Sequence, residues 1–212
     1  MRVLTRVLLL LTLPLAGSAL GKESAIPSLA RSSQLLVVIS DGWSTDHGTL
    51  QRFQREGRRW RPEGTPITVA LGRSGSGWGI GLHPSMEGGP RKVEGDGRSP
   101  AGVFQIDGAF GYAASAATAM PYQPMLDSSY CMDVPDSPFY NRIVDADQVG
   151  AEAVEGSTEP MRLDLHKDGD VRYRQGLLIA HNPNAVAGAG SCIFAHLRRH
   201  TDEATSGCTA MD

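Results

Sequence analysis

The 212-residue chain has only three cysteines and a single long apolar run, which lies at its N-terminus. No second apolar segment approaches the roughly 20 residues that a membrane-spanning helix needs. The chain also lacks internal repeats and low-complexity tracts, which excludes repeat architectures and argues against disorder. We therefore expect a soluble domain with no transmembrane helix once the N-terminal run is removed.

Runs of basic residues are absent as well. The chain has 20 Lys and Arg against 23 Asp and Glu, and loss of the two arginines in the N-terminal run leaves a net charge near −5. Proteins that bind nucleic acid carry clustered basic side chains to neutralise phosphates. The charge balance therefore argues against nucleic acid as a partner.

The N-terminus has the order of a secretory signal peptide. Arg2 and Arg6 supply positive charge, residues 7–15 form a short apolar stretch, and small residues follow up to Ala19. No cysteine stands directly after the apolar stretch, which argues against a lipidated N-terminus. We expect cleavage near Ala19 or Gly21. An uncleaved anchor helix is the alternative, but the apolar stretch is short for a bilayer.

The rest of the chain divides into two parts. After the signal peptide at residues 1–21, residues 22–34 are expected to be a polar connector, and residues 35–212 to be the functional domain. With 25 glycines and 13 prolines, the chain favours short strands and tight turns over long helices.

Short apolar runs bounded by glycine and proline predict the strands of a mainly β fold with packed sheets and few short helices. The Leu35–Ile39 run predicts a buried strand. Within residues 49–61, Leu50 and Phe53 fit a helical face, but Glu56-Gly57 and the flanking glycines and prolines favour a hairpin turn. The other strand candidates are Pro66–Leu71, Val103–Ile106, Leu177–His181 and Cys192–Leu197.

The C-terminal segment carries the densest set of reactive residues. His196 ends an apolar run, and Cys208 follows Gly207 after a polar stretch. A free cysteine is only slightly ionised at neutral pH, and a nearby imidazole lowers its pKa and accepts its proton. The glycine lets the backbone approach a substrate, and the amides of Gly207 and Cys208 are candidate oxyanion donors. This pattern predicts a Cys208 nucleophile with His196 as its base.

Two other interpretations stay open on the pattern alone. A lone cysteine often packs in a core as a small apolar residue. Cys192, His196, His200 and Cys208 also form C-x3-H-x3-H-x7-C, which suits a tetrahedral zinc ion. However, the segment from Cys192 to His196 has the pattern of a strand, which would separate these two ligands along the chain.

Residues 190–196 and 205–211 resemble the L,D-transpeptidase catalytic-domain (YkuD-like) family of bacterial cell-wall enzymes. The resemblance extends from about residue 35 over most of the chain. It includes the segments Gly72-Arg73-Ser74-Gly75, Trp78-Gly79, Gly81-Leu82-His83, Glu94-Gly95-Asp96-Gly97, Ser99–Phe104, Met120-Pro121-Tyr122 and Ser137–Arg142.

The resemblance implies packed mixed β-sheets and a cysteine that forms a thioester. Cys208 would attack the carbonyl that follows the L-centre of a diamino acid in a peptidoglycan stem tetrapeptide and release D-alanine. The acyl group would then pass to an amine or to water. His196 would be the base, oriented by a backbone carbonyl. No metal or organic cofactor is implied, acylation by carbapenems is expected, and the location would be the periplasm or cell envelope.

Three departures from the family pattern bear on this expectation. Ser206 stands where many members carry histidine, and Ala210 stands where many carry arginine or asparagine. The chain also ends at Asp212, four residues after Cys208, where members usually continue. Either the chain is truncated, or the nucleophile lies on a frayed terminus with weak activity.

The odd number of cysteines leaves at least one unpaired. With Cys208 assigned as the nucleophile, Cys131 and Cys192 are the natural disulfide partners. Connectivity cannot be read from sequence, so two buried thiols remain the alternative.

Tyr140, Asn141, His181 and Ser206 are the candidate substrate-binding residues. Turn formation at Tyr140 and Asn141, and a structural role for His181, stay open beside that assignment.

The sequence as a whole predicts a monomeric, exported L,D-transpeptidase whose partners are peptidoglycan stem peptides. An L,D-carboxypeptidase or amidase of the same chemistry is one alternative. A catalytically dead peptidoglycan-binding module is the other.

Overall fold

The computed structural model describes residues 27–200 and 203–212. The predicted signal peptide and the first part of the connector lie outside the described residues. Within those residues, no helix is long and apolar enough to cross a membrane. The last part of the predicted connector forms a short helix, α1 (Pro27–Arg31), and Leu29 accepts a hydrogen bond of 3.1 Å from the guanidinium of Arg55.

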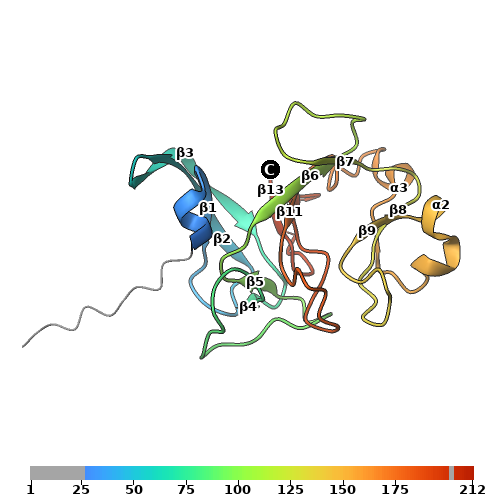
Figure 1. Cartoon of the computed structure of the whole chain (residues 1–212), viewed down its shortest axis with the longest axis horizontal. Helices are drawn as coiled ribbons and strands as arrows, with labels where there is room; N and C mark the ends of the chain where they lie inside the picture. Colours follow the sequence, from blue (N-terminus) through green and yellow to red (C-terminus); the bar gives the residue numbers. More distant parts are fainter. Residues whose placement is uncertain (1–26, 201–202) are drawn as a thin grey trace, which may run out of the picture.

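The described chain is mainly β, as predicted, with packed mixed sheets and a few helices of one turn or little more (Figure 1). The largest sheet has eight strands in the order β1-β2-β3-β13-β12-β11-β6-β7. Its pairs are antiparallel except for β12 with β13 and β6 with β7. The strands in that order are Gln34–Ile39, His47–Glu56, Arg59–Ala70, Thr209–Met211, Phe194–Leu197, Gln175–Ile179, Ile106–Gly111 and Tyr122–Pro124.

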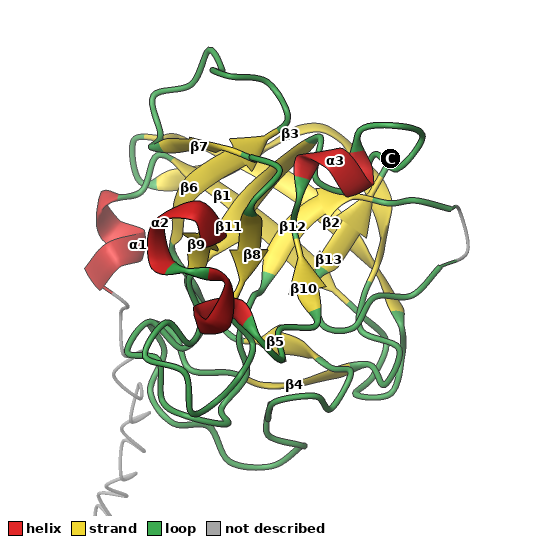
Figure 2. Ribbon diagram, turned by 90° about the vertical axis from the view of Figure 1, so that its right-hand side faces the viewer, coloured by secondary structure: helices red, strands yellow, loops and turns green. Residues whose placement is uncertain are grey.

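Two small sheets and three further helical segments complete the fold. The first sheet has the order β10-β8-β9 and the second pairs β4 with β5. The first lies over the large sheet, with β8 and β10 in front of β11 and β12 in Figure 2. The elements are β10 (Glu159–Pro160), β8 (Ser129–Cys131), β9 (Ile143–Asp145), β4 (Ser76–Trp78), β5 (Ser99–Ala101), α2 (Ala146–Val149), the 3-10 helix Ala151–Val154 and α3 (Leu163–His166).

The hairpin predicted around Glu56-Gly57 is confirmed. Glu56 of β2 pairs with Arg59 of β3, and Gly57 in the turn has a φ of 61°, a conformation that glycine adopts without strain. Most of the predicted strand at Pro66–Leu71 is the second half of β3, beyond a register shift in the β2–β3 pairing.

Four predicted strands differ from the structure, and one of them, Leu177–His181, ends at Ile179, so that His181 lies beyond β11. The first, β1, was predicted to be buried, but it is an edge strand and Ile39 is 67% exposed. Of the predicted strand Val103–Ile106, only Ile106 is in a strand, as the first residue of β6. Cys192 was predicted to begin a strand, but its φ of 55° is left-handed and β12 starts at Phe194. Apolar content alone does not reveal such a local turn.

The segment after Cys208 is not frayed. Residues Thr209–Met211 form β13, which lies inside the large sheet between β3 and β12. Ala210 pairs with Ala70 on one side and with His196 on the other. The nucleophile candidate therefore stands immediately before an interior strand.

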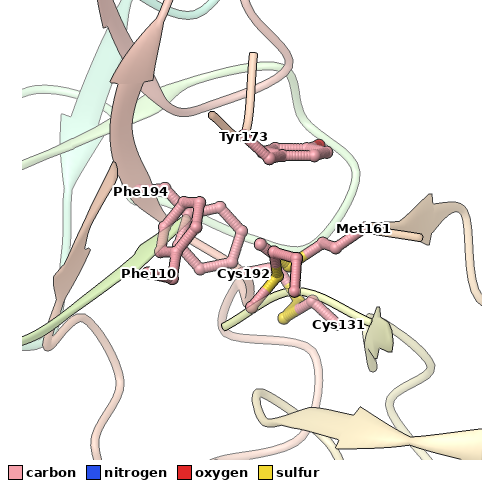
Figure 3. Close-up of a cluster of buried hydrophobic side chains, with 7 residues drawn as sticks. Phe110, Cys131, Met161, Tyr173, Cys192 and Phe194 are labelled. Carbon is pink, nitrogen blue, oxygen red and sulfur yellow. A yellow bond between two sulfur atoms is a disulfide. The ribbon is translucent and has the colours of Figure 1, made fainter. Parts of the chain in front are cut away.

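A buried cluster joins the large sheet to the three-stranded sheet (Figure 3). Phe110 and Phe194 of the large sheet pack edge to face, 5.2 Å between ring centroids. A disulfide links Cys131 of β8 to Cys192, which is the pairing expected from the sequence. Cys208 packs against this cluster. The disulfide therefore ties the two sheets together beside the candidate nucleophile.

Candidate active site

The turn before β13 is built by the hydroxyl of Thr205. Its Oγ1 accepts a hydrogen bond from the Gly207 amide at 3.1 Å and donates to the Cys208 carbonyl at 2.6 Å. The same carbonyl accepts a bond of 3.0 Å from Ser99 Oγ. A Cβ atom at Gly207 would lie 3.0 Å from the Arg98 carbonyl oxygen, which is tighter than ordinary packing. The Thr-x-Gly-Cys sequence thus fixes the backbone of Cys208.

The thiol of Cys208 is held between backbone groups. Its sulfur accepts a hydrogen bond from the Phe194 amide at 3.3 Å and lies 3.5 Å from the Cys192 carbonyl oxygen, to which it can donate. Cys208 is the free cysteine of the chain, because the other two form the disulfide. Cys208 therefore takes part in no disulfide, as the nucleophile hypothesis requires.

His196 and Cys208 line the same cavity, of about 120 Å³. Strands β12 and β13 are parallel, and Ala195 lies opposite Thr209, the residue that follows Cys208. His196 is the next residue of β12 and lies opposite Ala210. The imidazole is 9% exposed, and its Nδ1 lies 2.7 Å from the Leu197 carbonyl oxygen. Because a carbonyl only accepts, Nδ1 carries the proton and Nε2 is left with the lone pair.

The resting charge state differs from the expectation. Burial raises the pKa of the Cys208 thiol to about 12, and the Glu159 carboxylate adds to this rise. Burial also lowers the pKa of His196. The imidazole was expected to lower the thiol pKa, but desolvation of the thiolate dominates, and the groups that oppose the rise are the Phe194 amide and the charge of Lys92. The resting pair is therefore a neutral thiol and a neutral imidazole.

One wall of the cavity comes from residues that no sequence motif marks as functional. The Tyr173 ring lies edge-on to His196, with 5.8 Å between ring centroids, and its hydroxyl donates to the carboxylate of Glu159. Arg172 is hydrogen-bonded to Asp170, which also contacts the ring of a second buried histidine, His166. Glu159, Arg172 and Tyr173 belong to no recognisable motif, and only the three-dimensional fold places them in the cavity of Cys208.

Tyr140, Asn141 and His181 lie together, but not in the cavity that holds Cys208. They line a larger cavity of about 530 Å³, whose lining includes Cys192 and Phe194, the two residues that contact the Cys208 sulfur. The segment that holds the thiol therefore lines the larger cavity, whereas Cys208 itself lines the smaller one.

The polar groups of these three residues are occupied by the fold. His181 is 2% exposed, its Nε2 donates to the Ala189 carbonyl at 3.0 Å, and its Nδ1 accepts from the Ile80 amide at 3.3 Å. The amide group of Asn141 bonds the His181 carbonyl and the Cys192 amide. The Tyr140 hydroxyl donates to Glu94. They shape the wall of the larger cavity rather than present free hydrogen-bonding groups to a substrate.

Ser206 and Gly207 were expected to contact the substrate. Ser206 is exposed, lines the smaller cavity and accepts a bond of 3.1 Å from the Arg73 guanidinium. The Gly207 amide is already bonded to Thr205 Oγ1, so it is not free to stabilise an oxyanion as predicted. Of the predicted pair, the Cys208 amide remains the candidate donor.

The zinc interpretation fails on the disulfide. Because the sulfur of Cys192 is bonded to Cys131, it is not a thiolate and cannot complete the C-x3-H-x3-H-x7-C set. The Glu94–Gly97 segment is a turn. The carboxylate of Asp96 accepts hydrogen bonds from the Val93 and Arg98 amides and an ion pair of 2.6 Å from buried Lys92.

Comparisons of the chain with protein-family models, with curated proteins and with solved structures find no match. The family resemblance therefore rests on the sequence motifs alone.

Proposed function

We propose that the protein is an exported cysteine acyltransferase of the L,D-transpeptidase type that acts on peptidoglycan stem tetrapeptides. The observation that carries the proposal is the shared cavity of Cys208 and His196, in which Nδ1 of the imidazole is committed to a backbone carbonyl. That bond leaves Nε2 as the nitrogen able to accept the thiol proton.

The first half-reaction follows from this arrangement. The sulfur of Cys208 attacks the carbonyl carbon of the scissile amide while Nε2 of His196 takes the thiol proton. The tetrahedral intermediate then collapses, the carbon–nitrogen bond breaks, and His196 returns the proton to the departing D-alanine. The Phe194 amide, 3.3 Å from the sulfur, stabilises the negative charge that develops during proton transfer.

The second half-reaction discharges the thioester. An amine from another stem attacks the acyl carbon, the carbon–sulfur bond breaks, and the thiol is restored with an amide as product. Water in place of the amine would make the same protein an L,D-carboxypeptidase.

The proposal is tested with a purified stem tetrapeptide and an excess of a second stem that offers a free amine. Released D-alanine and the mass of the cross-linked product are measured for the wild type, for Cys208→Ala and for His196→Gln. The wild type should release D-alanine and form the cross-link, and both variants should lose this activity. Release without cross-linking would identify a hydrolase, and no release would refute the acyltransferase.

One observation favours a second function, that of a peptidoglycan-binding module without catalysis. The partly buried thiol, with a pKa of about 12, is poorly ionised at neutral pH. If the protein is such a module, the wild type and Cys208→Ala should bind isolated peptidoglycan equally well, and neither should release D-alanine. The ordered Thr205–Cys208 turn and the oriented His196 favour the enzyme instead.

A further inference from the structure

The cavity that holds Cys208 and His196 also contains a carboxyl group, that of Glu159. Glu159 begins β10 and comes from the three-stranded sheet, where it pairs with Cys131 of the disulfide. Its strand therefore lies in the layer opposite β12, which carries His196, and opposite β13, which follows Cys208 (Figure 2).

The hydrogen bonds of Glu159 leave one oxygen available. Oε1 accepts a bond from the hydroxyl of Tyr173, whose ring also borders His196. Among the described residues, Oε2 accepts no hydrogen bond. The carboxyl group is thus anchored on one side and has acceptor capacity on the other.

The charges of the cavity point to a cationic ligand. Its three arginines each have an acidic partner: Arg172 pairs with Asp170, Arg198 with Asp212 and Arg199 with Glu203. Within the described residues, Glu159 has no such ion pair. The acidic group that is left without an ion pair therefore lies beside the nucleophile, where an ammonium ion would balance it.

We infer that Glu159 binds the ammonium group of the acyl acceptor and removes its proton, which makes the amine a nucleophile toward the Cys208 thioester. The inference rests on the proposed function and names a residue for its second half-reaction. An amine that attacks a thioester must first lose a proton, because its lone pair is otherwise occupied.

The step balances in atoms and charge. The ammonium gives one proton to the Glu159 carboxylate, and the freed lone pair forms a carbon–nitrogen bond to the acyl carbon. The carbon–sulfur bond breaks, the sulfur keeps its electron pair, and His196 transfers the remaining surplus proton of the nitrogen to it. The products are an amide, the Cys208 thiol and a neutral Glu159, which then releases its proton to solvent.

The titration of Glu159 suits this role. Burial raises its pKa to about 7, the negative charge of Asp133 adds to the rise, and Arg172 opposes it. A proton acceptor works best when its pKa lies near the working pH. The charged and titratable groups around it are the ion pairs of Arg172, Arg198 and Arg199 described above, together with Asp133, Tyr173, His196 and Cys208.

The experiment separates the two half-reactions with Glu159→Gln. Acylation is followed by intact mass spectrometry after mixing with the stem tetrapeptide. Discharge is then measured at pH 7.5 with two probes, methylamine, which is protonated at that pH, and hydroxylamine, which is not. Glu203→Gln removes another carboxylate of the same cavity and is the matched control.

We expect Glu159→Gln to acylate within threefold of the wild-type rate. Its discharge by methylamine should fall at least tenfold, while its discharge by hydroxylamine stays within twofold. The control should show no such selective loss. Equal loss with both amines, loss of acylation, or unchanged discharge by methylamine would each overturn the role of Glu159. A wild type that forms no acyl-enzyme would instead refute the proposed function.

Discussion

The backbone amide of Phe194 donates a hydrogen bond of 3.3 Å to the sulfur of Cys208. Phe194 is the first residue of β12, two positions after the disulfide-bonded Cys192 and two before His196. One short segment therefore holds the sulfur, carries one half of the disulfide and carries His196. Four predictions follow from this arrangement and from the charges around it.

The thiol of Cys208 should react slowly with alkylating reagents in the folded, unliganded protein. Because its pKa is about 12, the thiolate fraction should rise tenfold for each pH unit between pH 7 and 10. The rate of reaction with iodoacetamide should follow that slope, with mass spectrometry used to locate the label. A plateau in the rate near pH 7 would mean that a preformed thiolate–imidazolium pair exists.

Removal of the disulfide should destabilise the domain. The bond joins residues separated by 61 positions, and closing a loop of that length contributes about 4 kcal/mol to the free energy of unfolding. The double variant Cys131→Ser/Cys192→Ser should lose about that amount in urea denaturation. Thiol titration of denatured wild type should give one reactive cysteine without reductant and three with it; three without reductant would contradict the pairing.

Thr205→Val should impair the site by releasing the turn before Cys208. The substitution removes one hydrogen bond to the Gly207 amide and one to the Cys208 carbonyl, each worth about 1 kcal/mol. Acylation of Cys208 should slow by about tenfold or more. Thr205→Ser keeps the hydroxyl and should retain most of the rate, so similar losses in both variants would argue against the turn.

Glu159→Gln should stabilise the protein at alkaline pH. The pKa of Glu159 is about 7 in the folded state, against 4.5 in the unfolded chain. Ionisation of this carboxyl therefore lowers the free energy of unfolding; the loss grows from pH 4.5 to pH 7, is fully present above pH 7 and is absent below pH 4.5. The variant should gain about 1–3 kcal/mol at pH 8 and lose that advantage toward pH 4.5. Urea denaturation at the two pH values measures the difference, and a gain that does not depend on pH would contradict it.

The sequence predicted the parts of the fold that local patterns encode. The turn residues Glu56-Gly57 predicted the β2–β3 hairpin. The C-terminal motif predicted that His196 and Cys208 belong to one site, and both residues line the same cavity. The start of β12 was missed because the left-handed conformation of Cys192 depends on its disulfide and on the side chain of Asn141, which are both distant in sequence.

The electrostatics of the site could not be predicted from the sequence. Burial decides the thiol pKa, and the degree of burial follows from how β10 and the segment around Tyr173 cover Cys208. Glu159 belongs to no motif, and it reaches the cavity only because β10 pairs with β8. Such a residue is found from the packing of the sheets and not from a spacing in the chain.

Intact mass spectrometry after incubation with a carbapenem tests the central claim most directly. If Cys208 is a nucleophile activated by His196, the wild type should gain the mass of one carbapenem, and the adduct should map to Cys208 by peptide analysis. Cys208→Ala should stay unmodified, and His196→Gln should react much more slowly. An unmodified wild type, or an adduct that persists in Cys208→Ala, would contradict the account.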